Sequence, residues 1–285
     1  ILNHTPAGID YGHPVFLDAD GTSRIYSIWD QTITPQNMKS GKIPDGFLFG
    51  AEYLRSDIDE ALMSDNPKNI VPSVDLNGHG TFLAGVACGN KIDERNFSGV
   101  APLADICVVK CREAKKSLKE YFRIGNDKIA YGEQDIMLGI KYLWQKAVKA
   151  GKPLIICFGI GTNIGGHERG GCLGEYLESI GNYSGVCAVT ACGNEANVGH
   201  HYRSGLLRSG DDVEVELRTG NDAGFTIELW ADSPNLYAIG IISPSGEYSG
   251  KTIAKIGEQQ RISFILEKTI IYIDYLITAY ESGDE

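Results

Sequence analysis

The sequence predicts an α/β fold in which a parallel sheet is flanked by helices and followed by a smaller antiparallel β module. Between residues 105 and 190, apolar runs of strand length alternate with helical patterns, which is typical of a buried parallel sheet. Beyond residue 205, short alternating strands are separated by turns rich in Gly, Asn, Pro and Ser, as in antiparallel β structure. We therefore expect two domains, at residues 1–204 and 205–285.

Individual elements follow from periodicity and from turn signals. The parallel part should have strands at 105–110, 154–158 and 186–190, and helices at 56–62, 82–88, 135–149 and 172–181. Residues 11–74 are rich in Gly, Pro, Asp and Asn with little periodicity, so we expect a long connection with local structure. The antiparallel part should have strands at 213–217, 225–229, 237–241, 261–266 and 271–275.

Composition excludes several classes of protein. The chain has 285 residues, 42% of them apolar and 22% charged, which is ordinary for a soluble globular protein. A formal net charge of −11 argues against a nucleic acid as partner. No apolar run reaches the roughly 20 residues that span a bilayer. The start, Ile1–His4, has no signal-peptide features, and we expect it to be a cut end within a larger precursor.

The seven cysteines do not form a recognisable metal or redox motif. No C-x-x-C pair is present, so neither a zinc site nor a dithiol centre is indicated. Cys107, Cys157, Cys187 and Cys192 lie in apolar runs. We expect them to be small buried hydrophobic residues in a reducing environment.

One histidine is set among small residues at the start of a predicted helix, in Asn77–Gly85 (N-G-H-G-T-F-L-A-G). The flanking glycines allow other groups to come close to His79, and a fixed imidazole is the group that general-base catalysis needs. The alternative for a lone histidine is a helix-capping role without chemistry. A second segment, Thr190–Asn197 (T-A-C-G-N-E-A-N), favours the catalytic interpretation.

Two glycine-containing segments directly follow predicted parallel strands. Gly159-Ile160-Gly161 follows the strand at 154–158, and Cys192-Gly193-Asn194 follows the strand at 186–190. Sites in such sheets form at the carboxyl edge, where both segments are expected. Residues 159–166 could alternatively form a phosphate loop, but they lack the P-loop lysine and the G-x-G-x-x-G spacing.

These segments together resemble the subtilisin-like serine proteases. Asn77–Gly85 is similar to their histidine segment, A-C-G-N-E to their oxyanion-hole segment, and Gly8-Ile9-Asp10 to the end of their aspartate segment. A closer resemblance is to the clostridial germination-specific Csp group. It is carried by G-I-D-Y-x-H-P-x-F, D-G-T-x-R-I-x-S-I-W-D-Q-T, I-V-P-S-V-D-x-x-G-H-G-T-F, D-I-M-L-G-I-x-Y-L and G-N-E-A-N-x-x-H-H-Y.

The resemblance implies a fold and roles for residues. It implies a subtilisin-like sheet with an inserted antiparallel β jellyroll at 205–285, incomplete in this chain. His79 would be the base, Asn194 the oxyanion-hole donor, and Gly159, Ile160 and Gly161 the strand along which substrate lies. In a serine protease an aspartate orients the base, but the corresponding position here is Pro6. Proline cannot accept a hydrogen bond from an imidazole through its side chain.

No serine of this sequence occupies the family's nucleophile position. Gly21-Thr22-Ser23 precedes the histidine and is interpreted as a turn, and Ser98 aligns with the non-catalytic G-V-A-P segment. The serine segment of the family follows the asparagine segment, so we expect it outside this chain. Asp10 aligns with a non-catalytic aspartate.

Two functions from the family therefore remain open. The favoured one is a catalytically inactive pseudoprotease that regulates spore germination. The alternative is an active endoprotease that cleaves the precursor of a spore cortex-lytic hydrolase. The resemblance implies a location at the spore cortex or coat. It also implies partners among other germination proteases or that precursor, with a small-molecule germinant as a further ligand. Charge and hydropathy, as above, predict neither a nucleic-acid partner nor a membrane span.

No cofactor is expected from motifs. Asp18-Ala19-Asp20-Gly21 resembles the start of a calcium loop, but the later ligands are missing and a turn is favoured. Calcium stays open because backbone carbonyls, which sequence does not reveal, serve as its ligands in subtilisin-like folds. His200-His201-Tyr202 is a polar cluster for which a structural role and a ligand role both remain open.

Overall fold

The computed structural model describes residues 2–5, 8–166, 171–220, 224–231, 235–255 and 257–276. The chain divides into two compact units, residues 1–227 and 228–285, each of which is considered by itself. The predicted domain boundary after residue 204 remains a prediction. Within the described residues, no helix is long and apolar enough to cross a membrane.

The first unit is built on a six-stranded sheet with the order β3-β2-β4-β1-β5-β6. All neighbouring strands are parallel except β2 and β3, which are antiparallel. The strands are β1 (Leu2–Thr5), β2 (Ile25–Asp30), β3 (Ala51–Leu54), β4 (Ile106–Lys110), β5 (Leu154–Phe158) and β6 (Val186–Thr190). The predicted α/β fold with a parallel sheet is confirmed.

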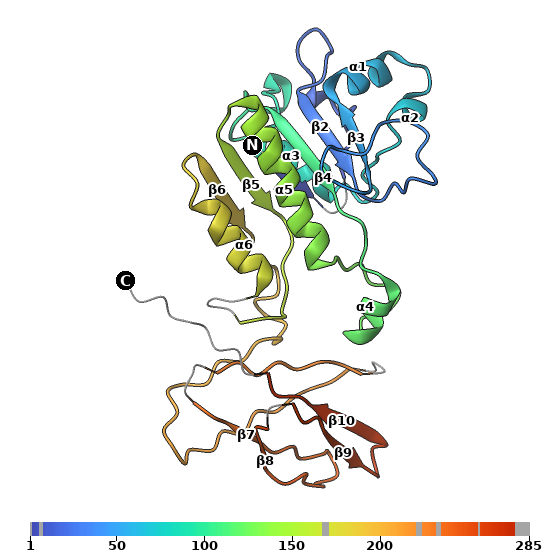
Figure 1. The fold of residues 1–285 in the computed structure, drawn as a ribbon. Coiled ribbons are helices and arrows are strands. Elements are labelled where there is room, and N and C mark those ends of the chain that lie inside the picture. Colours follow the sequence, from blue (N-terminus) through green and yellow to red (C-terminus); the bar gives the residue numbers. More distant parts are fainter. Residues whose placement is uncertain are drawn as a thin grey trace. The chain divides into compact units, whose positions relative to one another are not determined.

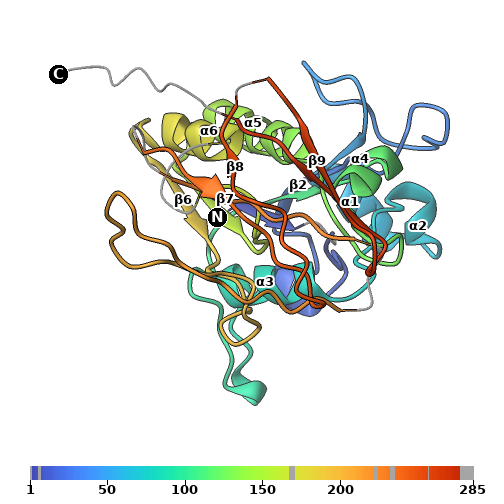
Figure 2. The ribbon, with the colours of Figure 1, turned by 90° about the horizontal axis from the view of Figure 1, so that it is seen from below.

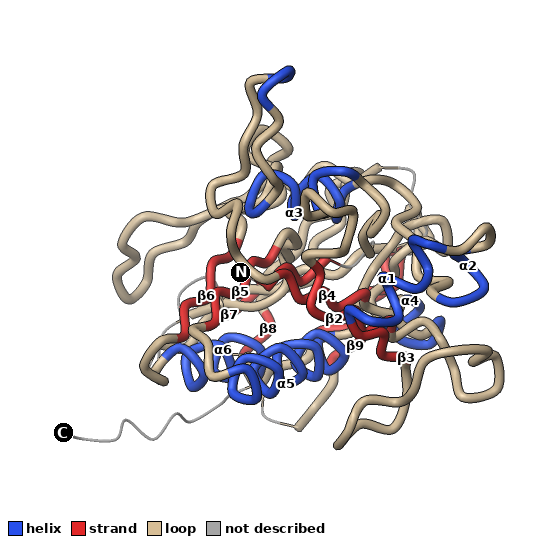
Figure 3. The backbone as a smooth tube through the Cα atoms, turned by 90° about the horizontal axis from the view of Figure 1, so that it is seen from above, coloured by secondary structure: helices blue, strands red, loops and turns tan. Residues whose placement is uncertain are grey.

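Helices cover both faces of this sheet, as Figures 1 to 3 show. Helices α5 and α6 lie on one face, and α3 lies on the other (Figure 3). The helices of the unit are α1 (Arg55–Met63), α2 (Pro67–Ile70), α3 (His79–Cys88), α4 (Lys116–Tyr121), α5 (Glu133–Ala150) and α6 (Cys172–Gly181), with short 3-10 helices at Pro14–Phe16 and Asp93–Arg95. A left-handed Gly151 ends α5, as its position after the periodic run predicts.

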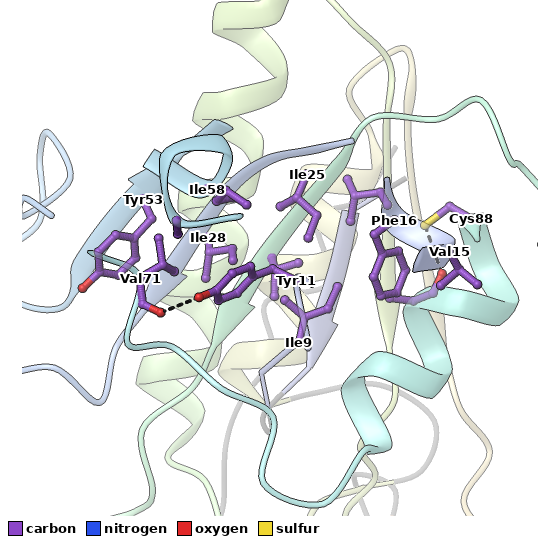
Figure 4. Close-up of a cluster of buried hydrophobic side chains, with 14 of the residues drawn as sticks. Ile9, Tyr11, Val15, Phe16, Ile25, Ile28, Tyr53, Ile58, Val71 and Cys88 are labelled. Atoms are coloured by element: carbon purple, nitrogen blue, oxygen red, sulfur yellow. Dashed lines mark hydrogen bonds between the residues drawn. The ribbon is translucent and has the colours of Figure 1, made fainter. Parts of the chain in front are cut away.

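Each face of the sheet has its own hydrophobic cluster. On the α5 side, Trp29, Tyr142 and Leu143 are almost fully buried. On the α3 side, Ile9, Phe16, Ile25 and Ile28 pack with Ile58, Tyr53 and Cys88 (Figure 4). The hydroxyl of Tyr11 donates to the carbonyl of Val71 at 3.0 Å within this second cluster (Figure 4). Every residue of β4 is buried, which is why its sequence is continuously apolar up to Lys110.

Residues 11–74 contain more structure than expected. They form β2, β3, α1 and α2, whereas the sequence predicted a connection with only a helix near 56–62. In β2, five of the six residues are buried, so no two-residue alternation marks it as a strand. The surrounding Gly and Pro residues also resemble those of a loop.

Strand β6 lies at the edge of the sheet, and this corrects the prediction for two cysteines. Val186 and Ala188 pack against the α6 side, while Cys187 on the opposite face is exposed, as is Cys192 beyond the strand. Cys107 is buried and Cys157 is half-buried. The expectation of four buried cysteines is therefore wrong for Cys187 and Cys192, because an edge strand is covered on fewer sides than a central one.

The second unit contains short antiparallel pairs. Strand β7 (Ala238–Ile239) pairs with β8 (Thr252–Ile253), and β9 (Gln260–Phe264) pairs with β10 (Thr269–Ile273). The expected strands near 237–241, 261–266 and 271–275 thus correspond to β7, β9 and β10. Residues 213–217 and 225–229 form no strand, and the jellyroll interpretation remains a prediction.

A buried arginine ties β2, α3 and the segment before β4 together. Arg24 is 6% exposed. One terminal nitrogen donates to the Cys88 carbonyl at 2.8 Å and to Asn90 Oδ1 at 2.7 Å, and the other donates to the Ala104 carbonyl at 2.9 Å. The planar guanidinium of Arg24 can donate to several acceptors at once. Its buried charge is therefore compensated by hydrogen bonds, and the same bonds give the buried carbonyls their donors.

Replacing Arg24 should therefore destabilise the first unit. We expect Arg24→Ala to lower the free energy of unfolding by about 3 kcal/mol, because it leaves buried carbonyls without donors. Arg24→Lys should recover only part of this, since an ammonium lacks the planar fork. Urea denaturation of the full-length protein measures both. Arg95→Lys, at the exposed end of the short 3-10 helix Asp93–Arg95, is the matched control, and an equal loss in that variant would contradict the prediction.

Candidate active site

An aspartate closes the first turn of α3 and thereby fixes the start of the histidine helix. Asp75 Oδ2 accepts from the backbone N–H and the hydroxyl of Thr81 at 2.8 and 2.7 Å. Its Oδ1 accepts from the backbone N–H of Asn77 and of Gly78 at 3.2 and 2.9 Å. Gly78 has φ +78°, a left-handed conformation that glycine adopts without strain. The carboxylate satisfies N–H groups that a helix start leaves unpaired.

Hydrogen bonding and burial shift the pKa of the Asp75 carboxylate in opposite directions. Burial alone would raise the pKa of Asp75, but the hydrogen bonds from Thr81, Asn77 and Gly78 outweigh it and hold the pKa below the usual value.

The segment before Asp75 is also tied to the sheet. The buried ammonium of Lys110, at the end of β4, donates to the Val74 carbonyl at 3.0 Å and lies 3.5 Å from Asp30 Oδ2.

Removing the Asp75 carboxylate should loosen the start of α3. We expect Asp75→Ala to cost about 1–2 kcal/mol of stability, as for other helix caps. Because the folded-state pKa is lowered, this contribution is present above the unfolded value of about 3.9 and is lost as pH falls through the folded value. Urea unfolding measured from neutral pH down to about pH 3 tests both statements.

The control for this prediction is Asp65→Asn, an exposed carboxylate that lines the same surface groove as Asp75. It should change the unfolding midpoint little at neutral pH. If Asp75→Ala and the wild-type protein lost stability in parallel on acidification, the assigned role of Asp75 would be wrong.

The His79 side chain is directed at the carboxyl end of β5. Its backbone N–H donates to Asn77 Oδ1 at 3.0 Å, and its Nε2 lies 3.1 Å from the carbonyl oxygen of Gly159. Because a carbonyl oxygen can only accept, this contact is a hydrogen bond in the tautomer that carries the proton on Nε2. The side chain is exposed. The ring nitrogen that would face a nucleophile is therefore engaged by the backbone.

Gly159 has little room for a side chain. A Cβ at this position would overlap Cδ1 of Leu83 and would lie 3.3 Å from His79 Nε2. Leu83 belongs to α3, so the helix and the end of β5 meet at this point. A glycine here allows the close approach.

The loop after β6 lies beside the same segment. The N–H of Ala191 donates to the Phe158 carbonyl at 3.1 Å, which continues the pairing of β5 and β6. A Cβ at Gly161 would lie 3.9 Å from Cα of Gly193. Asn194 follows in an exposed turn. His79 and the loop of Asn194 thus both border the segment Gly159-Ile160-Gly161 at one edge of the sheet.

Comparison with known proteins adds to this geometry. The model of the subtilase family of peptidases matches residues 7–253. The chain belongs to the subtilase family. Among solved structures it is similar to the CspB protease of Clostridium perfringens, with a TM-score of 0.63 and 26% sequence identity over 91% of this chain and 50% of that chain.

The subtilase therefore spans about half the length of the CspB chain to which it is similar. A psychrophilic protease gives a TM-score of 0.40 with 18% identity, over 68% of this chain and 45% of that one. No match is found among curated protein sequences.

The structure does not describe the position predicted for the catalytic acid. Pro6, at the position predicted for the aspartate, lies outside the described residues, as does the adjacent Ala7. The nearby Asp10 is engaged elsewhere: its Oδ1 accepts from the N–H of Gly12 at 3.2 Å, and its own N–H donates to Thr81 Oγ1 at 2.9 Å. Among the described residues, the hydrogen bond of the His79 ring is the one to Gly159.

Ser23 and Ser98, the two serines considered in the sequence, both make hydrogen bonds within the fold. Ser23 is fully buried, its Oγ accepts from the N–H of Ile25, and its N–H donates to Asp59 of α1. Ser98 Oγ donates to the carbonyl of Gly99. Both serines thus make structural hydrogen bonds, and the expectation that neither is the nucleophile stays a prediction.

A polar cluster joins the two loops of the site. Glu195 Oε2 accepts from Asn163 Nδ2 at 2.6 Å and from His200 Nδ1 at 3.0 Å. The hydrogen bond from Asn163, and then that from His200, lowers the pKa of Glu195. His200 was noticed in the sequence as part of a polar run, but its partners were not, because Asn163 belongs to another loop. Within the described residues, no group of three His, Cys, Asp or Glu side chains could hold a metal ion.

Proposed function

We propose that this subtilase is a catalytically inactive pseudoprotease that regulates spore germination. The observation that carries the proposal is the contact between His79 Nε2 and the Gly159 carbonyl. A catalytic histidine must offer a lone pair on the nitrogen that faces the nucleophile, while an acid holds the proton on the other nitrogen. The contact with Gly159 favours the tautomer that carries the proton on Nε2, which is the wrong nitrogen for that role.

The sequence supports the same conclusion. Pro6 stands where the resemblance places the orienting aspartate, and Asp10 is engaged by its own turn. An acid favours the tautomer with Nδ1 protonated, and its loss costs about 10⁴-fold in rate where it has been tested. Without that acid, nothing in the described residues opposes the tautomer that donates to Gly159.

A regulator needs partners instead of a substrate. We propose that it acts at the spore cortex or coat, together with another germination protease or with the precursor of a cortex-lytic hydrolase. A small-molecule germinant is a further proposed ligand. This part of the proposal rests on the similarity to the CspB protease and on the motifs shared with the Csp group.

An active protease is the second candidate. It is favoured by the retained arrangement of His79, Gly159–Gly161 and the Asn194 loop at one edge, and by the similarity to a chain named as a protease. In that case the oxyanion-hole amide of Asn194 would contribute about 3 kcal/mol to catalysis, and the acid would be dispensable or supplied elsewhere.

A cleavage assay separates the two candidates. Purified full-length protein is mixed with the inactive precursor of a cortex-lytic hydrolase, and the size of the precursor is followed, with an active clostridial Csp protease as positive control. We expect no cleavage above about 10⁻⁴ of the control rate. A fluorophosphonate probe, which labels activated serines, should label the control and not this protein.

The decisive comparison is His79→Ala. Cleavage by the wild-type protein that disappears in this variant would overturn the pseudoprotease proposal and establish the second candidate. Cleavage that persists in the variant would point to a contaminating protease in the preparation, which the probe would reveal as a labelled band of another size.

A further inference from the structure

The connection between β4 and α5 forms a separate lobe of the first unit. It comprises residues 111–132, which we call the α4 lobe, whereas connections in α/β units commonly have about 2–6 residues. Figure 1 shows α4 beyond the end of α5 and away from the sheet. Long connections in compact domains are usually functional loops or disordered linkers. The α4 lobe begins at the carboxyl end of β4, and the candidate site lies at the carboxyl ends of the same parallel strands.

Internal contacts give the α4 lobe a defined structure. The ammonium of Lys119, a residue only 6% exposed, donates to Glu113 Oε2 and to the Lys128 carbonyl, both at 2.8 Å. Glu113 and Tyr131 form an antiparallel bridge, and the N–H of Ala114 donates to the Ala130 carbonyl at 2.8 Å. Burying a lysine is costly unless its charge is paired and hydrogen-bonded. Because Lys119 has both kinds of partner, the lobe is a built element rather than a loose linker.

The charge of the α4 lobe is opposite to that of the whole chain. It carries six Lys and Arg residues against three acidic ones, in a chain of net charge −11. Lys116 pairs with Glu120 at 3.6 Å, and Lys128 lies 3.5 Å from Asp127. Lys115 and Arg123 are exposed and form no ion pair with any described residue. The lobe therefore presents an uncompensated positive charge on an acidic molecule.

A small cleft lies beside Lys115. It has a volume of about 280 Å³ and is lined by Lys115, Ser117, Leu118, Tyr121 and Gln134. Ammonium, hydroxyl and amide groups in this lining can all donate hydrogen bonds, while Leu118 and the ring of Tyr121 are apolar. Tyr121 is 76% exposed. The volume of the cleft lies at the lower end of the roughly 300–1,000 Å³ of small-molecule sites, and the cleft has room for one side chain of a larger partner.

We propose that the α4 lobe is a docking surface for an acidic peptide segment of a partner protein. One carboxylate side chain enters the cleft and pairs with Lys115, an apolar residue packs on Tyr121, and further carboxylates are attracted to Arg123. Charge complementarity steers such an encounter, and an aromatic side chain anchors it. Glu113, Glu120 and Asp127 interrupt the positive surface and would repel a continuous polyphosphate. The proposal goes beyond the proposed function and holds whether or not the protein cleaves peptides.

The test measures binding of a short fluorescein-labelled peptide, rich in Glu with one central Phe, to the full-length protein. Fluorescence anisotropy is recorded at about 50 mM salt, where surface charges are weakly screened. We expect Lys115→Glu combined with Arg123→Glu to weaken binding about 10-fold or more, and high salt to reduce that difference. Tyr121→Ser, or Phe→Ser in the peptide, should weaken binding about 3-fold.

The matched control is Lys39→Glu combined with Lys149→Glu, which changes the net charge equally at exposed positions outside the lobe. Unfolding midpoints confirm that all variants are folded. Retained binding in the control and loss in the lobe variant support the proposal. Equal loss in both, no binding by the wild-type protein, or equally tight lobe-dependent binding of a single-stranded oligonucleotide or an anionic vesicle would overturn it. So would concentration-dependent self-association that the lobe variant abolishes, because the occupant would then be a second copy.

Discussion

The hydrogen bonds that Asp75 accepts from the first turn of α3 are the interaction on which the candidate site depends. They fix where the helix begins, and His79 is its first residue. The same turn receives the N–H of Asp10 through Thr81, so the segment after β1 is tied to it. Because Lys110 of β4 donates a hydrogen bond to the Val74 carbonyl, the histidine is held at a fixed position relative to the central strands of the sheet.

From this fixed start, the direction of the imidazole follows from a close approach. Gly159 leaves no space for a side chain between β5 and α3, and its carbonyl takes the hydrogen bond of His79 Nε2. The arrangement keeps the framework of a catalytic edge while engaging the nitrogen that catalysis would need. This arrangement supports the proposal that the subtilase presents surfaces to partners instead of cleaving a chain. The positive α4 lobe, which leaves the same sheet between β4 and α5, is one such surface.

Much of the fold and part of the site could be predicted from local sequence. The runs that became β4, β5 and β6, and the helix closed by Gly151, were found because burial on both faces and a glycine stop leave a clear pattern. The meeting of Gly159-Ile160-Gly161 with the Asn194 loop at one edge also followed from parallel topology, whereas the contact of His79 with Gly159 did not. Strands β2 and β3 were missed because their neighbours resemble loops, and Cys187 was misplaced because sequence does not reveal which strand lies at an edge.

The sequence by itself determined which chemical groups are present: a histidine between glycines, an asparagine after a strand, and Pro6 in place of an acid. Those are properties of single positions, and motifs report them directly. Only the tertiary structure decided which partner each group has. Asp75 closes a helix, Arg24 binds the carbonyls of Cys88 and Ala104, and Glu195 joins Asn163 to His200. The reason is that hydrogen bonds join residues separated by tens of positions in the chain, and only the packed backbone sets those distances.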